Sequence, residues 1–215
     1  LAPVANNTGV LRLWNGQSFT TQAGLSNTGI IDVDETSTLV IGNGKTLVNN
    51  AGGVLTGSGT IQGNVASYGG GIAPGNSPGS LTIDGDLQLD SDSNLVMEIA
   101  GAAASERDHL AVTGTAGLSG MVDVILTEDF EYEWDTYYTY ELMSFASSTG
   151  SFDGVSVAFP FDPEYPDLEA DASLIYDTDS VSVQFAIVPE PTTCAVLLIG
   201  AGALVLRRHR RGRMM

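Results

Sequence analysis

One short segment carries the spacing of a catalytic serine. Gly75, Ser77 and Gly79 reproduce the G-x-S-x-G pattern of the turn that holds the nucleophile of many serine hydrolases. That turn takes an oxyanion-hole N–H from the residue after the serine, and here this residue is Pro78, which has none. His109 stands in an alternating apolar segment without a triad-like context. We therefore predict a turn between strands and no catalytic residue.

Two further patterns suggest phosphate and transition-metal sites but are incomplete. The segment from Gly42 to Thr46 contains the Gly-Lys-Thr ending of a phosphate-binding loop, yet Leu39 occupies the place of its first glycine and no helix pattern follows. Zinc, iron and copper favour histidine and cysteine as ligands. Before the basic residues 207–213, the sequence contains only His109 and Cys194 of these two types. We expect a β-turn at Lys45 and no site for these metals.

Oxygen ligands are abundant, and aspartates gather in two groups. The groups are Asp84, Asp86, Asp90 and Asp92, and further on Asp171, Asp177 and Asp179. Calcium prefers several flexible carboxylates, but neither group follows the EF-hand or the glycine-rich nonapeptide calcium repeat. We expect a solvated acidic face and no cofactor, with a weak calcium site at the first group as the alternative.

Carboxylates also alternate with aromatic rings, an arrangement that could contact sugars. If residues 128–140 form a strand, one face carries Phe130, Tyr132 and Trp134, and the other carries Glu131, Glu133 and Asp135. We expect these rings to pack into the protein, with stacking on a neutral sugar as the alternative. Paired carboxylates that cleave an anionic sugar would need a basic residue nearby, and Arg12, Lys45 and Arg107 are scattered along the sequence.

The elements that must position these residues are short β-strands. From Asn6 to about Ile99, short segments alternate apolar with small or polar residues and are bounded by Gly and Asn. An Asn-Asn or Asn-Thr pair before Gly recurs at 6–9, 27–29 and 49–52, a spacing of roughly 20 residues that fits one turn of a solenoid. We expect these Asn and Gly residues at left-handed corners. The strand pattern alone leaves a flat antiparallel sandwich open.

Composition divides the chain into three parts. Residues 1–107 are predicted to form the solenoid. Residues 108–187 are predicted to form a β-rich cap, made of a β-sandwich or of the last, more irregular turns, because an open solenoid end must be covered. Residues 188–215 form a tail. The predicted fold class is therefore all-β, followed by a short hydrophobic helix at the C-terminus.

Charge separates the body from the tail. Before Val188 the chain has three basic residues and all but one of its 26 acidic residues. A body this acidic repels nucleic acids, so no nucleic-acid partner is expected. Cys194 is the single cysteine, so no intramolecular disulfide can form and stability must come from packing and hydrogen bonds.

The tail combines three elements in a fixed order. Pro189, Glu190 and Pro191 come first. An apolar segment follows, made of Cys194, Ala195, Val196, Leu197, Leu198, Ile199, Gly200, Ala201, Gly202, Ala203, Leu204, Val205 and Leu206. A basic stop comes last, made of Arg207, Arg208, Arg210, Arg211 and Arg213.

Such a tail predicts temporary membrane attachment. As a helix the apolar segment would rise ~20 Å at ~1.5 Å per residue, short of the ~30 Å hydrocarbon core, although snorkelling arginines extend its reach. The arginines should stay on the cytoplasmic side, so the body should lie across the membrane from the cytoplasm. Because the chain begins at Leu1 without a leader, we expect an export signal upstream.

The tail resembles the PEP-CTERM sorting signal of Gram-negative bacteria that make extracellular polysaccharide. The resemblance implies recognition by an exosortase, an integral-membrane transpeptidase-like enzyme that removes or replaces the tail near the triplet. It implies an exported protein, held transiently at the membrane and destined for the cell surface or the extracellular space.

Residues 52–89 resemble the repeat of autotransporter passenger regions and of many PEP-CTERM proteins, a GxxxGxGxIxGxV unit followed by an APGxSPGxLxIxGxL unit. The matching residues are Gly53, Gly57, Gly59, Ile61, Gly63, Val65, Ala73, Pro74, Gly75, Ser77, Pro78, Gly79, Leu81, Ile83, Gly85 and Leu87. This resemblance implies a right-handed parallel β-helix.

Together these observations predict a non-enzymatic, exported structural or adhesive protein of the cell surface or extracellular matrix, associated with exopolysaccharide. One alternative is a carbohydrate-active or carbohydrate-binding domain on the same β-helix, similar to polysaccharide lyases or glycosidases. Another is a calcium-stabilised matrix module.

Overall fold

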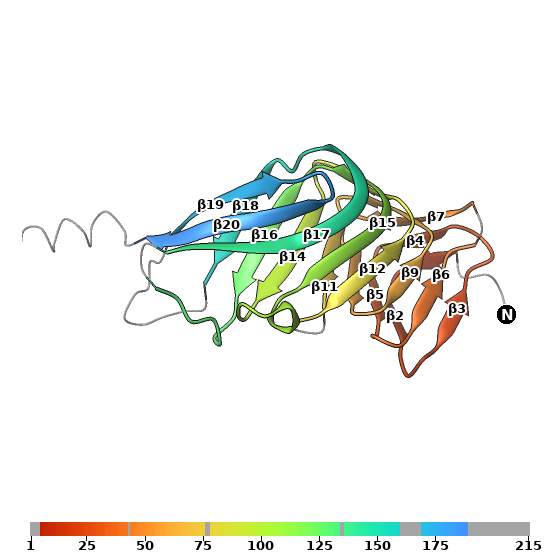
Figure 1. The fold of residues 1–215 in the computed structure, drawn as a ribbon. Helices are drawn as coiled ribbons and strands as arrows, with labels where there is room; N and C mark the ends of the chain where they lie inside the picture. Colours follow the sequence, from red (N-terminus) through yellow and green to blue (C-terminus); the bar gives the residue numbers. More distant parts are fainter. Residues whose placement is uncertain (1–4, 43, 76–77, 134–135, 160–168, 189–215) are drawn as a thin grey trace, which may run out of the picture.

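The chain winds into a solenoid of parallel β-strands (Figure 1). The computed structural model describes residues 5–42, 44–75, 78–133, 136–159 and 169–188. Within these ranges the regular structure is all strand, apart from a single 3₁₀ turn, η1 (Ala104–Glu106). The predicted parallel β-solenoid is thus confirmed, and the flat antiparallel sandwich is excluded for this part of the chain.

Each full turn of the solenoid contributes one strand to each of three faces. The first face consists of β2 (Val10–Leu13), β5 (Ile30–Val33), β8 (Val54–Gly57), β11 (Gly71–Pro74), β14 (Asn94–Ile99), β16 (Met121–Leu126) and β18 (Gly154–Ala158). The second consists of β3 (Ser18–Thr20), β6 (Thr38–Val40), β9 (Thr60–Gln62), β12 (Ser80–Asp84) and the first half of β15 (His109–Leu118).

The third face consists of β1 (Asn6–Asn7), β4 (Leu25–Asn27), β7 (Thr46–Asn50), β10 (Asn64–Tyr68) and β13 (Leu87–Leu89). The second half of β15 continues this face, because Ala116 pairs with Leu87 whereas Leu110 pairs with Leu81. One bent strand therefore belongs to two faces, and it joins them into one sheet.

The core is a set of aliphatic columns that run along the solenoid. Leu25, Leu47, Val65 and Leu87 are register partners on successive turns, and all four are buried. Strand alternation sends every second side chain inward, so each turn covers the apolar residues of the next. Burying one such side chain stabilises the fold by about 1.5–3 kcal/mol. The turns are stable only as a stack.

A second internal column is polar. Asn7 Nδ2 donates to Asn27 Oδ1 at 2.8 Å, and Asn27 Nδ2 donates to Asn49 Oδ1 at 2.8 Å. Asn49 Nδ2 then donates to Ser67 Oγ at 3.4 Å and to Gly71 O at 3.0 Å. The recurring asparagines therefore mark successive turns, as predicted, and their spacing is 20 and 22 residues.

The conformation predicted for these asparagines is wrong. Among the described residues other than glycine, Asn15 alone has a positive φ, and the three column asparagines lie in β1, β4 and β7 with their side chains turned inward. Extended backbone at these positions lets the side-chain amides bond along the solenoid axis. Of the glycines in the same three segments, Gly52 has the expected left-handed backbone, with φ +83°, whereas Gly9 and Gly29 do not have a positive φ.

Antiparallel strands follow the last turns. Parallel pairing continues past residue 107 through β15 and β16 to β18 and to β17 (Tyr137–Gly150). β20 (Ser180–Val188) then pairs antiparallel with β17 and with β19 (Glu169–Tyr176). Phe185 of β20 is fully buried against Tyr138 and Tyr140 of β17 and against Phe130. These aromatic residues belong to the same buried core as the aliphatic columns. The strands β17 and β20 that carry them lie toward the C-terminal end of the solenoid (Figure 1).

Candidate functional site

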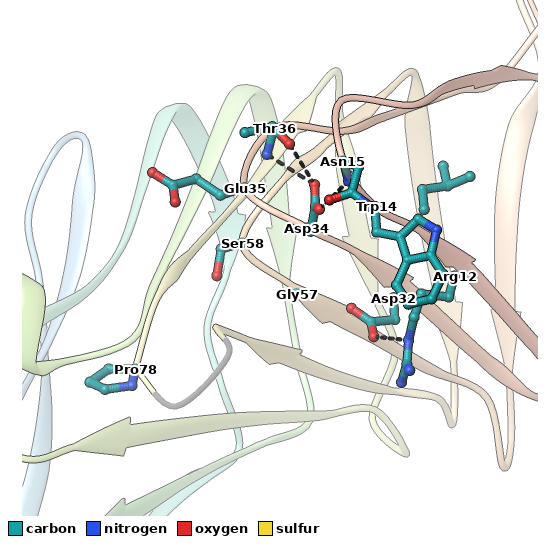
Figure 2. Close-up of a pocket in the computed structure, with 11 residues that line it drawn as sticks. Arg12, Trp14, Asn15, Asp32, Asp34, Glu35, Thr36, Gly57, Ser58 and Pro78 are labelled. Atoms are coloured by element: carbon teal, nitrogen blue, oxygen red, sulfur yellow. Dashed lines mark hydrogen bonds and ion pairs between the residues drawn. The ribbon is translucent and has the colours of Figure 1, made fainter.

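A groove lies at the corner where the first face turns into the second, across the N-terminal turns (Figure 2). Its volume is about 730 Å³. Arg12, Trp14, Asp32, Asp34, Glu35 and Ser58 line it, together with neighbouring backbone and Pro78. Its walls come from the ends of β2 and β5, from the three corners that follow β2, β5 and β8, and from Pro78 in the next corner, after β11.

The first corner is a tight turn that presents Trp14. Gln17 N donates to Trp14 O at 3.3 Å, while Asn15 and Gly16 have φ of +56° and +73°. Two consecutive positive φ angles are typical of a type I′ turn, which asparagine and glycine tolerate best. The turn places the indole at the surface, where Trp14 is 54% exposed.

The second corner holds the first in place. Its side chains accept the backbone N–H groups of the first corner: Asp34 Oδ2 from Asn15 at 2.6 Å, Thr36 Oγ1 from Gly16 at 2.8 Å, and Ser37 Oγ from Gln17 at 3.1 Å. Asp34 Oδ1 also accepts from the N and Oγ1 of Thr36, both at 3.0 Å. The Ser37 hydroxyl, with the Asn15 and Thr36 donors, holds the pKa of Asp34 below its ordinary value.

The third corner creates the hollow. It consists of Gly57, Ser58 and Gly59, so two of its three residues have no side chain. A Cβ at Gly57 would overlap Val33 O, and one at Gly59 would overlap Asp34 O. Glycine is required because this corner packs directly on the backbone of the second corner. The absence of side chains leaves space between the Trp14 corner and Pro78.

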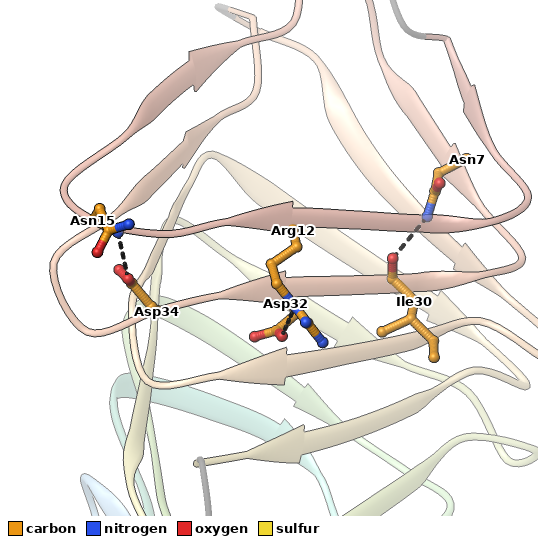
Figure 3. A network of polar contacts seen from close by, with 6 residues as sticks. All are labelled: Asn7, Arg12, Asn15, Ile30, Asp32 and Asp34. Carbon is orange, nitrogen blue, oxygen red and sulfur yellow. Dashed lines mark hydrogen bonds and ion pairs between the residues drawn. The ribbon is translucent and has the colours of Figure 1, made fainter.

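An ion pair between two lining residues lies next to the Trp14 indole in the groove. Arg12 Nε and Asp32 Oδ2 are 2.7 Å apart, on register partners of β2 and β5 (Figure 3). Asn7 bonds the same two turns together, because its Nδ2 donates to Ile30 O at 3.0 Å. The guanidinium carries further N–H donors beyond Nε. The groove thus combines an aromatic face, carboxylates and N–H donors.

A second hollow, of about 680 Å³, involves the predicted aromatic and acidic segment. The strand predicted from Phe130 is wrong for residues 130–133, which are irregular and follow a turn in which Phe130 N donates to Thr127 O at 3.1 Å. The alternation itself holds: Phe130 is buried and Tyr132 half-buried, whereas Glu131 and Glu133 are exposed. These two rings therefore pack against the core, as expected. Trp134 and Asp135 lie outside the described residues.

The four aspartates proposed for calcium occupy two different corners and bond mainly to neighbouring turns. Asp84 Oδ1 accepts from Thr113 Oγ1 at 2.9 Å, and Asp86 Oδ1 accepts from Thr115 N at 2.8 Å. Asp90 Oδ1 accepts from Ser93 Oγ at 2.7 Å and from Gly69 N at 3.0 Å, and Asp92 is exposed. Within the described ranges no three histidine, cysteine or acidic residues are close enough to hold a metal ion.

The other patterns weighed from the sequence are turn and strand residues. Lys45 N donates to Gly42 O at 2.9 Å, so Lys45 closes the expected β-turn. The segment with the serine-hydrolase spacing connects β11 to β12, and Ser77 lies outside the described residues. His109 begins β15, 3.3 Å from Glu141 Oε1, and burial lowers its pKa.

Sequence reasoning missed a buried carboxyl group. Asp108 is 2% exposed, and its two oxygens accept from Gly79 N and Glu98 N, each at 2.8 Å. Burial raises the pKa of Asp108 to about 6. The sequence offers no signal for this role, because its partners are 29 and 10 residues away. The groove was missed for the same reason, because lining residues such as Trp14 and Ser58 come from different solenoid turns.

The predicted sorting triplet, apolar segment and basic stop all lie outside the described residues. In the part of the chain that the structure describes, no helix has the length and apolar character needed to cross a membrane.

Comparison with known proteins bears on the tail. Residues 188–211 match the family model of the PEP-CTERM protein-sorting motif. A search of curated proteins found no match. The tail is therefore a PEP-CTERM sorting motif, which is a substrate signal for exosortase, and the chain is an exported protein.

Proposed function

We propose that this exported protein is a non-enzymatic structural or adhesive component of the cell surface or extracellular matrix, associated with exopolysaccharide. The observation that carries the proposal is the use of its acidic side chains. Asp34, Asp86 and Asp90 each accept backbone N–H groups from a neighbouring turn. Carboxylates used in this way hold the solenoid together, whereas a hydrolytic pair must be free to exchange protons with substrate and water.

The fold supports the same function. A solenoid whose turns stack on one continuous core presents long, regular surfaces, which suit extended contacts with polymers. Its acidic surface keeps the protein soluble after export. An exosortase substrate that reaches the cell surface then contacts the polysaccharide outside the cell through these faces.

The test separates a structural role from an enzymatic one. The full chain is produced in a host that encodes an exosortase, the matrix fraction is collected, and retention of the protein is compared with that in a polysaccharide-deficient strain. In parallel, the purified full chain is incubated with a panel of neutral and anionic polysaccharides, and new reducing ends are counted. We expect polysaccharide-dependent retention and no turnover. Turnover that disappears in Asp32→Asn or Glu35→Gln would overturn the proposal in favour of a carbohydrate-active enzyme.

A further inference from the structure

We propose that the groove at the first three corners binds a neutral polysaccharide segment, with the Trp14 indole as its stacking platform. This inference rests on the proposed association with exopolysaccharide and assigns it to one site. The groove volume of about 730 Å³ lies within the range of ~300–1,000 Å³ that is usual for small-molecule sites. A few sugar units of a longer chain therefore fit the hollow above the glycine corner.

The exposed indole is the first argument. A large aromatic side chain normally buries its ring, yet Trp14 is 54% exposed at the edge of the groove. Its backbone belongs to a turn whose next three N–H groups are all accepted by the second corner. The ring is thus presented from a rigid support, and little conformational entropy is lost when a flat apolar sugar face stacks on it.

Charge selects the class of sugar. Asp32, Asp34 and Glu35 line the groove, and Arg12 is the single basic residue among its lining residues. The guanidinium is already paired with Asp32. A uronic acid or sulfated sugar would meet excess negative charge, whereas the hydroxyls of a neutral sugar can donate to carboxylates and accept from the guanidinium. The groove therefore favours neutral over anionic polymers.

Tryptophan fluorescence gives a direct measurement, because the chain contains only Trp14 and Trp134. The full chain in mild detergent is titrated with cellohexaose and laminarihexaose as neutral probes, and with hexagalacturonate as the anionic probe. We expect a saturable change with at least one neutral probe. Hexagalacturonate should bind about tenfold more weakly at low salt, and the difference should shrink at high salt.

Three variants test which aromatic residue binds the sugar and which tryptophan produces the fluorescence change. Trp14→Ala should weaken binding by about tenfold or more, measured by calorimetry because the fluorophore is lost. Tyr68→Ala removes another half-exposed aromatic ring, 50% exposed on the third face, and should bind like the parent. Trp134→Phe should retain the fluorescence change. Unchanged melting temperatures show that the variants are folded.

Three results would overturn the inference: no saturable binding of either neutral probe, undiminished binding by Trp14→Ala, or tighter binding of hexagalacturonate. Chromatography of the same samples separates this outcome from failure of the proposed function. Shortened hexasaccharides would refute the non-enzymatic role, whereas intact but unbound hexasaccharides would refute the groove assignment alone.

Discussion

Asn27 and Asn49 lie one turn apart inside the solenoid, where Asn27 Nδ2 donates to Asn49 Oδ1 at 2.8 Å and both residues are 0% exposed. The bond connects two turns through the interior, parallel to the backbone ladders on the faces. Amides suit this position because each has a donor and an acceptor, so every member can bond to the turn before and the turn after. A column of this kind is stable only when its members are all in register.

Replacing Asn49 with alanine should therefore destabilise the protein strongly. The change leaves the carbonyl of Gly71 without the Asn49 donor, removes the acceptor of Asn27 and opens a small cavity. We expect a loss of ~2–4 kcal/mol in the free energy of unfolding, measured by urea denaturation. Asn6→Ala is the matched control, because Asn6 is exposed in the first strand, and it should cost less than ~0.5 kcal/mol. Equal losses in the two variants would refute the role of the column.

The third corner should not tolerate a side chain. Gly57 has φ +103°, and a Cβ there would overlap Val33 O, so Gly57→Ala should cost ~3 kcal/mol or more through strain and overlap. Gly44→Ala provides the comparison, since Gly44 has φ +67° but nothing within 4 Å of its Cβ position. It should lose only ~1–2 kcal/mol, from the left-handed backbone alone. Thermal unfolding of the two variants measures the difference, and similar melting temperatures would contradict the packing described here.

Asp34 should control the rigidity of the first corner. Asp34→Ala removes the acceptor of Asn15 N–H and of Thr36 N–H, so both amide protons should exchange several-fold faster with solvent. Hydrogen exchange followed by NMR resolves these amides individually, and that of Ile31 in β5 serves as an internal reference. Glu35→Ala removes the same charge at the neighbouring position and should leave the Asn15 amide protected. Unchanged exchange at Asn15 in Asp34→Ala would disprove the coupling of the two corners.

Asp108 should make stability depend on pH. Its pKa in the folded protein, about 6, lies above the ordinary value of 3.8, so the folded state binds this proton more tightly than the unfolded state. The resulting stabilisation is fully present below about pH 4 and is lost as the pH rises to 6 and beyond. A shift of this size corresponds to about 3 kcal/mol.

The measurement is the difference in unfolding free energy between the parent and Asp108→Asn, followed from pH 4 to pH 7. The parent should lose up to ~3 kcal/mol relative to the variant over this range. Asp34 and Asp90 have lowered pKa values and act in the opposite direction at lower pH, but the comparison cancels them because both proteins contain them. A difference that does not vary with pH would rule out the assignment to Asp108.

The tail should determine maturation. Alanines in place of Pro189, Glu190 and Pro191 should leave an unprocessed precursor in the membrane fraction, because exosortase recognition requires the sorting motif. Fractionation followed by mass spectrometry of the mature chain detects this. Alanines at Thr192 and Thr193 provide the control and should mature normally. Normal maturation without the triplet would indicate a simple membrane anchor.

The alternation of apolar residues predicted the short strands of the solenoid, although not the irregular backbone of residues 130–133. Alternation is a local signal that spans a few positions. The recurrence of asparagine about every 20 residues predicted the length of a turn. The orientation of the asparagines was not predictable in this way. An asparagine before a glycine suits either a left-handed corner or an inward amide, and only the register of Asn7, Asn27 and Asn49 decides between them.

By itself, the sequence determined the short strands, a repeat length that fits one solenoid turn, and the sorting signal of the tail. The strands follow from local periodicity, the parallel β-helix was implied by the resemblance of residues 52–89, and the sorting signal is a linear motif that is recognised without a fold. Only the tertiary structure decided that Trp14 stands over a groove, that Asp34 supports its corner and that Asp108 is buried. These relationships join residues that are 10 to 29 positions apart in the sequence. A slip of one residue in register would exchange inside for outside. The groove and the buried carboxyl group therefore form only when whole turns stack, because residues of several segments contribute to each.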